Sequence, residues 1–371
     1  MTKPRFLVLE NGRVFEGQAF GADADAIGEV VFTTNMTGYL ETLTDPSYEG
    51  QIVLQTFPLI GNYGVNPKDQ ESRKSFVQGY IVSQWCQSPS HFCCEGALDA
   101  FLKAQGIPGL CGIDTRALTK LIRTAGVLRG ALADDPAQIS QDMLRTFRIG
   151  DAVSRVTLNE PARTPAHPDP ARQTASRLLR VVLWDFGVKD SSVHRLADRG
   201  CDVTVVPSSW TAAQILAEQP DGVLLSNGPG DPEENTAVIA EIRKLVESGT
   251  PIFGICLGHQ LLALANGGAT EKLKYGHRGG NHPVRDLVTG RTYITSQNHG
   301  YAVRLQEDQL PQNARPRYLN ANDGTCEGLD YEGFPGFSVQ FHPEARGGPR
   351  DTEFLFDRFV ALMEGRKFVC R

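Results

Sequence analysis

The length, composition and charge of this chain exclude several kinds of protein. Its 371 residues are too many for one ordinary core and predict two domains, and 40% hydrophobic with 22% charged residues is typical of a soluble globular protein. The net charge of −6 gives no reason to expect nucleic acid or an anionic membrane as partner. No run is long enough to span a membrane, and no secretory signal precedes the first strand-like run, so we expect a cytoplasmic protein.

Residues 1–150 predict a mixed α+β domain. The apolar run 6–10, the dipeptide Asn11-Gly12 and then Val14-Phe15 indicate a hairpin, because Asn-Gly suits a tight type I′ turn. Further strands are expected at 29–34, 51–56 and 76–83, and helices at 97–105 and 115–124, the second capped by Asp114 and followed by Gly126. We find no nucleophile or metal cluster in this half, and the segment 86–96 with its paired cysteines fits no motif.

A proline-rich segment follows this half. Residues 159–177 contain four prolines and almost no large apolar side chain. We therefore expect a linker over 151–177, between an N-terminal domain (1–150) and a C-terminal domain (178–371).

The C-terminal half alternates strand and helix patterns. The expected strands are 178–184, 203–206, 222–226 and 251–255, and the helices between and after them are 191–198, 212–218, 234–248 and a segment starting at 257. This alternation predicts parallel βαβ units in a doubly wound sheet, so the fold class is α/β. Ligands of such sheets lie outside the carboxyl ends of the strands.

Cys256 stands where one of these strands meets a helix. Gly254 and Gly258 flank it at two residues on either side, which permits the sharp turn of a nucleophile elbow with sulfur in place of the usual serine oxygen. The helix N-terminus and its unpaired N–H groups favour the thiolate, the reactive form. A lone cysteine is more often a small buried hydrophobe, but this context favours a nucleophile.

His342 has the best context for a base. It ends the alternating run 337–341, and Pro343 places Glu344 two residues away, where its carboxylate can orient the imidazole. The plain alternative is a solvated turn at a strand end. His259, close to Cys256, is assigned to packing. Weaker candidates lie in loop-like, glycine-rich surroundings: His277, His282 and His299.

Two polar loops follow predicted strands. Residues 226–232 (Ser-Asn-Gly-Pro-Gly-Asp-Pro) form a rigid turn whose N–H groups can face an oxyanion or a carboxylate. The absence of a following Gly-Lys-Ser/Thr excludes a phosphate loop of the Walker type. Residues 297–301 (Gln-Asn-His-Gly-Tyr) form a second such loop. No cysteine and histidine spacing indicates zinc, so no metal site is expected.

These motifs occur together, and in the same order, in a known family. The segments 254–260, 226–232 and 341–344 resemble the class I, triad-type glutamine amidotransferase domain. The segments 35–39, 44–48, 61–64 and 112–116, with 184–187 and 297–300, resemble the small subunit of carbamoyl phosphate synthetases. The resemblance covers essentially the whole chain.

The resemblance implies an activity and a set of site residues. Cys256 would attack the glutamine side-chain amide, His342 would act as acid and base, and Glu344 would orient His342. Tyr301 stands where the family usually has phenylalanine. The implied contacts to glutamine are Ser47 (from the other domain), Gly228, Gly230, Leu257, Gln260, Asn298, Gly300 and Tyr301.

The resemblance also implies a partner. No ATP-binding signature is present, so we expect ATP, its metal ion and bicarbonate to act on a separate large subunit, in a heterodimer or higher oligomer, with no cofactor in this chain. The product, carbamoyl phosphate, would serve arginine and pyrimidine synthesis. Alternatives are the glutaminase of another synthetase, a regulatory subunit with an inactive triad, and, more remotely, a cysteine peptidase.

Overall fold

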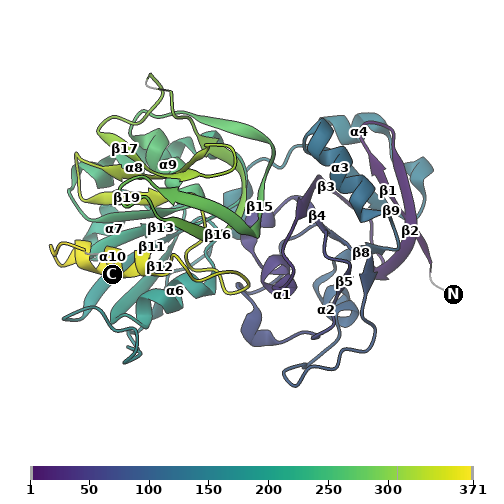
Figure 1. The fold of residues 1–371 in the computed structure, drawn as a ribbon, viewed down its shortest axis with the longest axis horizontal. Helices are drawn as coiled ribbons and strands as arrows, with labels where there is room; N and C mark the ends of the chain where they lie inside the picture. Colours follow the sequence, from purple (N-terminus) through teal and green to yellow (C-terminus); the bar gives the residue numbers. More distant parts are fainter. Residues whose placement is uncertain (1–2, 307, 369–371) are drawn as a thin grey trace. The chain divides into compact units, whose positions relative to one another are not determined.

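A closed β-barrel forms the centre of the first of two units. The computed structural model describes residues 3–306 and 308–368, and the chain divides into two compact units between Gly150 and Asp151. The barrel follows the order β1-β2-β8-β6-β4-β3-β9 (Figure 1). Its strands are β1 (Pro4–Leu9), β2 (Val14–Gly21), β3 (Ala26–Thr33), β4 (Gln51–Gln55), β6 (Gly79–Ile81), β8 (Pro108–Cys111) and β9 (Leu128–Ala133). The helices of this unit are α1 (Tyr39–Leu43), α2 (Leu98–Gln105), α3 (Thr115–Ala125) and α4 (Gln141–Thr146), and β5 (Leu59–Ile60) pairs with β7 (Gln84–Trp85).

The local predictions for this unit are confirmed. β1 and β2 form the expected antiparallel hairpin, with Gly12 at φ 83° in the turn. The Asp114 side chain accepts a hydrogen bond from the Ala117 N–H at 2.9 Å at the start of α3, and Gly126 ends that helix. Closure of the barrel was not predicted, because it depends on β9 pairing with both β1 and β3, far apart in sequence.

One large sheet organises the second unit, in the order β10-β12-β11-β13-β14-β19-β18-β17-β15-β16. The strands from β12 to β19 in this order pair in parallel, as predicted, and β10 and the four strands beyond β19 pair antiparallel. The parallel strands are β11 (Leu179–Asp185), β12 (Cys201–Pro207), β13 (Gly222–Leu225), β14 (Ile252–Ile255) and β19 (Gly336–Val339), and the others are β10 (Ala162–Thr164), β15 (Thr270–Asp286), β16 (Thr292–Val303), β17 (Ala314–Asn320) and β18 (Cys326–Tyr331).

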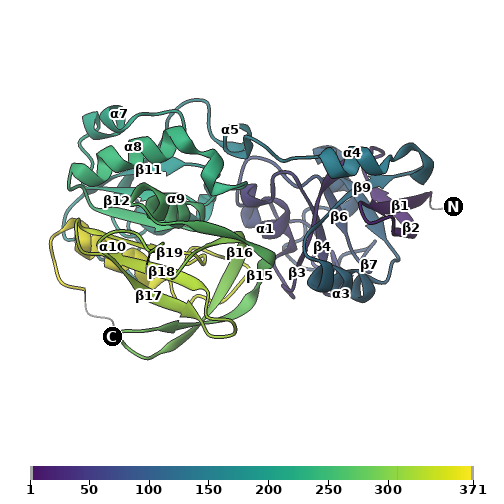
Figure 2. The same cartoon turned by 90° about the horizontal axis from the view of Figure 1, so that it is seen from above.

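Helices cover both faces of this sheet, because its strands are apolar on both sides. In β11, Val182 and Trp184 belong to a core shared with α7, α8 and α9, whereas Val181 and Leu183 belong to a core shared with α6 and α10. Figure 2 shows α8 and α10 on opposite sides of this sheet. The doubly wound α/β prediction is thus confirmed. The helices are α5 (Ala152–Val156), α6 (Asp190–Ala197), α7 (Ala212–Ala217), α8 (Thr236–Glu247), α9 (Leu257–Ala265) and α10 (Phe354–Met363). Within the described residues, no helix has the length and apolar character needed to cross a membrane.

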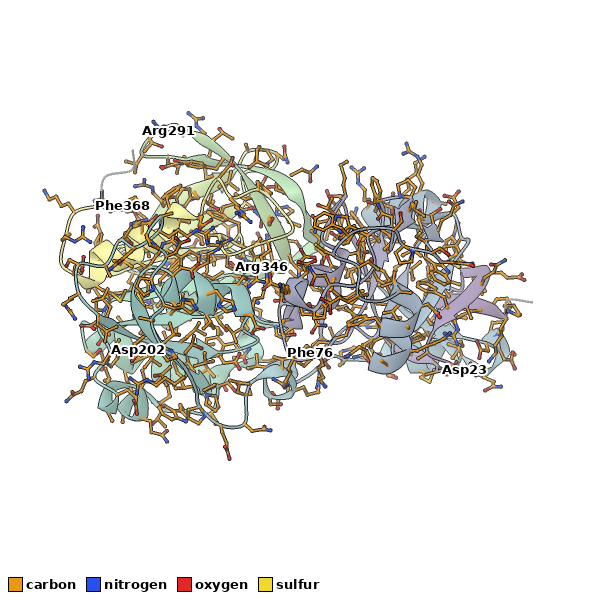
Figure 3. All side chains as sticks on the ribbon, turned by 90° about the horizontal axis from the view of Figure 1, so that it is seen from below. Asp23, Phe76, Asp202, Arg291, Arg346 and Phe368 are labelled. Atoms are coloured by element: carbon orange, nitrogen blue, oxygen red, sulfur yellow. The ribbon has the colours of Figure 1, made fainter. Side chains whose placement is uncertain are left out.

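The segment 151–177 differs from the predicted linker, since it packs within the second unit. It contains α5 and the short edge strand β10, which pairs antiparallel with β12. Arg163 of β10 forms an ion pair with Asp202 of β12, which is labelled in Figure 3. Pro161 and Pro165 flank β10, and an edge position tolerates proline because one side of the strand donates no ladder hydrogen bonds.

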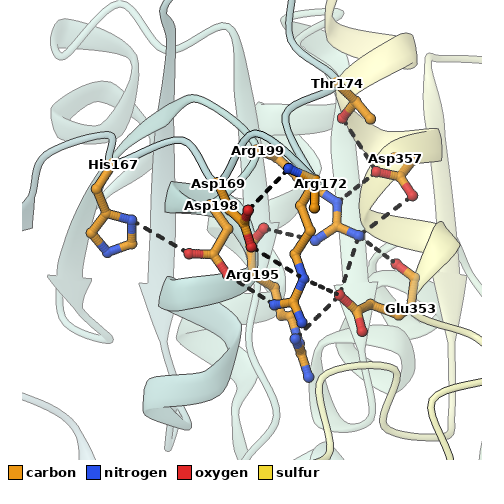
Figure 4. A network of polar contacts seen from close by, with 10 residues as sticks. His167, Asp169, Arg172, Thr174, Arg195, Asp198, Arg199, Glu353 and Asp357 are labelled. Atoms are coloured by element: carbon orange, nitrogen blue, oxygen red, sulfur yellow. Dashed lines mark hydrogen bonds and ion pairs between the residues drawn. The ribbon is translucent and has the colours of Figure 1, made fainter.

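Polar contacts fasten the rest of that segment to the helices. Arg172 donates to Asp198, at the end of α6, at 3.0 Å, and Thr174 donates to Asp357 of α10 at 3.2 Å (Figure 4). Arg199 Nε donates to the same Asp357 at 2.6 Å. The proline content predicted an extended backbone. It did not predict the side-chain contacts that hold this backbone against α6 and α10.

Two further segments predicted as loops are strands. Residues 297–301 lie inside β16, His277 and His282 lie inside β15, and the two long strands pair antiparallel. Glycines at 276, 279 and 280 remove the apolar alternation that identifies a strand, so only the pairing partner reveals this one.

Candidate active site

The predicted elbow is present at Cys256, between β14 and α9. Its backbone has φ 53° and ψ −104°, a conformation that costs a non-glycine residue about 1–3 kcal/mol. The Cys256 N–H donates to the Val339 carbonyl of β19 at 2.8 Å, and the Gly258 N–H donates to the Ser226 carbonyl after β13 at 3.0 Å. The neighbouring strand ends therefore hold the turn in its strained form.

Gly258 makes the close approach of α9 to β13 possible. A Cβ atom at this position would lie 2.2 Å from the Leu225 carbonyl oxygen, which is backbone and cannot move aside. We expect Gly258→Ala to destabilise the second unit by about 2–3 kcal/mol and lower its melting temperature by roughly 5–10 °C. Calorimetry checks this, with Gly96→Ala as control, because a Cβ at Gly96 would meet nothing within 4 Å. Equal melting temperatures for both variants would contradict the steric argument.

His342 and Glu344 lie together in the turn that follows β19, and Lys189 contacts both of them. His342 Nδ1 is 2.7 Å from Glu344 Oε1, so the ring donates its Nδ1 proton to the carboxylate. Lys189 Nζ lies 2.9 Å from the same Oε1 and 3.1 Å from Nδ1. All three side chains are buried. Among the described residues, Nε2 of His342 has no hydrogen-bond partner within normal distance, which leaves it available to a reacting group.

The charges of this group are set by the contacts between its members. Burial and Lys189 oppose the imidazolium, but the Glu344 carboxylate and the nearby Cys256 thiol outweigh them and raise the pKa of His342 to about 10. Burial also opposes the charged form of Glu344, but Lys189 and His342 hold its pKa well below the ordinary value. At neutral pH the arrangement therefore holds an imidazolium beside the thiol and an ionised carboxylate behind it.

The glycine loop after β13 borders the elbow. Gly228 packs so tightly that a Cβ there would lie 2.2 Å from the Phe186 carbonyl oxygen and 2.8 Å from a Leu257 methyl carbon. Gly230 has φ 89°, which suits glycine. A hydrogen bond also holds the loop against the segment after β11, since Asn227 Nδ2 donates to the Gly187 carbonyl at 2.8 Å. The predicted turn is thus held close to the first residue of α9.

The remaining predicted contacts lie on α9 and β16, except for one. Cys256 Sγ donates weakly to the Asn298 carbonyl at 3.7 Å, and Gln260 Nε2 donates to the Tyr301 carbonyl at 2.9 Å. These bonds bring the 298–301 part of β16 beside the elbow. Ser47 belongs to the first unit, in the 3-10 turn Pro46–Tyr48, where its N–H donates to Asp45 at 2.9 Å. Its role toward glutamine stays a prediction.

Two residues near the site complete its description. His259 is fully buried, and its Nδ1 lies 2.8 Å from Ser338 Oγ; burial lowers its pKa to about 3, so it is a neutral packing residue, as expected. Lys189 was missed by sequence reasoning. Its position four residues beyond the end of β11, on the same edge of the sheet as the elbow, was the signal that could have found it.

Comparisons with known proteins agree with this geometry. The family model "Glutamine amidotransferase class-I" matches residues 182–362, which include the elbow, His342, Glu344 and Lys189. The second unit is therefore a class I glutamine amidotransferase domain. The model "Carbamoyl-phosphate synthase small chain, CPSase domain" matches residues 7–132 of the first unit. The chain belongs to the carbamoyl phosphate synthase small chain family.

Curated relatives match over nearly the full length. The carbamoyl phosphate synthase small chain of Clostridium perfringens is 50% identical, covering 95% of this chain and 98% of that protein. That of Oceanobacillus iheyensis is 47% identical over 98% of this chain and 97% of that protein. The pyrimidine-specific small chain of Bacillus subtilis is 49% identical over 97% of this chain and 96% of that protein.

Proposed function

We propose that this chain hydrolyses glutamine and supplies the ammonia to a carbamoyl phosphate synthase reaction on a separate large subunit. The observation that carries the proposal is the strained Cys256 elbow beside the His342–Glu344 pair, whose Nδ1 and Oε1 atoms are 2.7 Å apart. A thiol beside an imidazolium favours the nucleophilic thiolate. Membership of the small chain family supports the choice of glutamine and of the partner.

The proposed reaction is acyl transfer through a thioester. Cys256 Sγ attacks the side-chain amide carbon of glutamine, and His342 Nε2 gives its proton to the departing ammonia. His342 then takes a proton from water, which hydrolyses the γ-glutamyl thioester to glutamate and frees Sγ. Backbone N–H groups near Leu257 and Gly230 would stabilise the oxyanion, each contributing roughly 3–4 kcal/mol.

The ATP-dependent steps are assigned to the large subunit. The carbamoyl phosphate produced there would serve pyrimidine and arginine synthesis, and the name of the Bacillus subtilis relative supports the first of these. This chain would hold glutamine but no ATP, and it would act in the cytoplasm as part of a heterodimer or a higher oligomer.

The decisive experiment measures glutamate release by the isolated chain, and then with its candidate large subunit, ATP and bicarbonate. Idle hydrolysis would waste glutamine, so we expect the complete complex to release glutamate much faster than the isolated chain. Absence of any stimulation would favour the glutaminase of another synthetase. Failure of a glutamine-analogue electrophile to label Cys256 would instead favour a regulatory subunit with an inactive triad.

A further inference from the structure

Three buried side chains with metal-binding atoms converge in the antiparallel part of the sheet. His277 of β15 and His299 of β16 are direct cross-strand partners, and Glu327 lies on β18. Their exposed fractions are 7%, 4% and 0%. One nitrogen or oxygen from each lies within 4.8 Å of the other two. Within the described residues, no other group of three or more His, Cys, Asp or Glu side chains is placed to hold a metal ion.

Hydrogen bonds on the outer side of both rings determine which atoms face inward. His299 Nδ1 lies 2.7 Å from the Tyr301 carbonyl oxygen, which only accepts, so Nδ1 carries the proton and Nε2 of the neutral ring keeps its lone pair. His277 Nε2 lies 2.8 Å from Asp323 Oδ2 and donates to it. A histidine that binds a metal commonly donates its other N–H to a carboxylate or a backbone carbonyl in this way.

The inward atoms of both rings make no hydrogen bond within normal distance to any described residue, although His277 Nδ1 lies 3.6 Å from Glu327 Oε1. His277 Nδ1 and His299 Nε2 are buried and have no hydrogen-bond partner among the described residues. Buried polar atoms are normally satisfied, so two such nitrogens facing one carboxylate point to a ligand between them.

Glu327 is oriented as a ligand would be. Its Oε1 accepts from Asn320 Nδ2 and its Oε2 accepts from Gln297 Nε2, both at 2.8 Å, so neutral amides fix the carboxylate without neutralising it. The nearest cationic candidate is His277, whose Nδ1 is 3.6 Å from Oε1. A buried carboxylate needs a compensating charge, which a cation bound between these side chains would provide.

We propose that His277, His299 and Glu327 bind one divalent transition-metal ion, with zinc preferred. Two imidazole nitrogens and one carboxylate oxygen suit zinc, whereas magnesium and calcium favour sites made of oxygen ligands. Ligand bonds of about 2.0–2.2 Å require the three atoms to move closer together than their present spacing, which side-chain rotation can provide. The ion would be structural and would tie three strands together.

A metal ion bound at this position would also affect the proposed active site. His299 directly follows Asn298, whose carbonyl accepts the weak bond from the Cys256 thiol. An ion held by His299 would therefore restrain the part of β16 that carries this carbonyl. The inference concerns metal binding itself and does not depend on the proposed function.

Cobalt(II) provides the test, because its visible spectrum reports ligand type and number. The purified full chain is dialysed against micromolar Co²⁺, and bound metal is counted by elemental analysis. We expect one equivalent per chain, visible bands of a nitrogen and oxygen site without thiolate charge-transfer bands, displacement by Zn²⁺, and a higher melting temperature with Zn²⁺.

Two variants remove a ligand atom while keeping the outer hydrogen bond. In His277→Gln the amide replaces the outer Nε2 donor, and in His299→Asn it replaces the outer Nδ1 donor. Each should weaken metal binding at least about 100-fold, since loss of an outer partner alone can cost that much. His167→Asn is the matched control, because His167 is half exposed and paired with Asp198 in another part of the unit.

Each possible result of these experiments either supports the metal site or overturns it. No stoichiometric metal in the wild-type chain would overturn the proposal and leave a proton on His277 as the compensating charge. Thiolate bands, or binding that survives both substitutions, would overturn it in favour of cysteines elsewhere. If a variant fails to fold, the stoichiometry and spectrum of the wild-type chain still decide the question, and none of these readouts measures glutamine hydrolysis.

Discussion

Cys256→Ser is expected to abolish glutamine-dependent carbamoyl phosphate synthesis by the complex of this chain with its large subunit. The serine hydroxyl is a far weaker nucleophile than a cysteine sulfur, because it loses its proton far less readily. We expect a loss of about 10³-fold or more, the scale seen when one member of a catalytic group is removed. The measurement is product formation with glutamine as the nitrogen source.

Ammonia-driven synthesis by the same complex is the internal control. It bypasses Cys256 and should persist in the variant. Cys93→Ser makes the same chemical change at a partly buried thiol of the first unit and should alter neither activity. If Cys256→Ser removed both activities, the division of labour between two subunits would be wrong. Full glutamine-dependent activity in the variant would exclude Cys256 as the nucleophile.

Lys189→Met is expected to lower the stability of the second unit by removing a buried ion pair. Lys189 Nζ lies 2.9 Å from Glu344 Oε1, and the exposed fractions of the two side chains are 7% and 0%. Met cannot donate, so Glu344 Oε1 loses one charged hydrogen bond but keeps His342 as a cationic partner, and we expect a loss of about 1.5–3 kcal/mol of unfolding free energy. Denaturant unfolding of the second unit at neutral pH measures the loss. Lys244→Met is the matched control, because the exposed pair of Lys244 with Glu241 should contribute less than about 1 kcal/mol.

The unfolding free energy lost in Lys189→Met should also depend on pH. Lys189 and His342 hold the pKa of Glu344 below its ordinary value of 4.5, so this carboxylate stabilises the fold above pH 4.5 and loses that contribution as pH falls through the lowered pKa. Without Lys189 the pKa of Glu344 rises. The deficit of Lys189→Met should therefore be greatest at neutral pH and shrink below pH 4.5. A deficit that stays constant on acidification would show that the lysine acts through packing of its methylene groups.

The local parts of the site could be predicted from sequence because each is encoded by adjacent residues. The elbow needs only a strand, two glycines and a helix around Cys256, and the His342–Glu344 pair is separated by one proline. Lys189 joins that pair from 153 residues away, and no local pattern reports such a contact. The same reason hides the metal-binding candidates, since His277 and His299 meet only through strand register.

The fold, too, could be predicted only where it depends on residues close together in the sequence. The hairpin at Asn11-Gly12, the Asp114 cap and the parallel βαβ units follow from turn chemistry and apolar periodicity. Closure of the barrel and the antiparallel extension beyond β19 depend on pairing between distant strands. The edge strand β10 was obscured by its flanking prolines, which permit an edge position and also resemble a linker.

The strained backbone at Cys256 links chemical reactivity to the completeness of folding. Its left-handed conformation persists only while β13 and β19 hold the turn through the Ser226 and Val339 carbonyls. Those strands are separated by more than 100 residues, so a chain still emerging from the ribosome lacks one of the two supports. We therefore expect such a chain, which lacks the turn that holds Cys256 in place, to hydrolyse no glutamine. Ammonia release would then be confined to molecules whose second unit is complete.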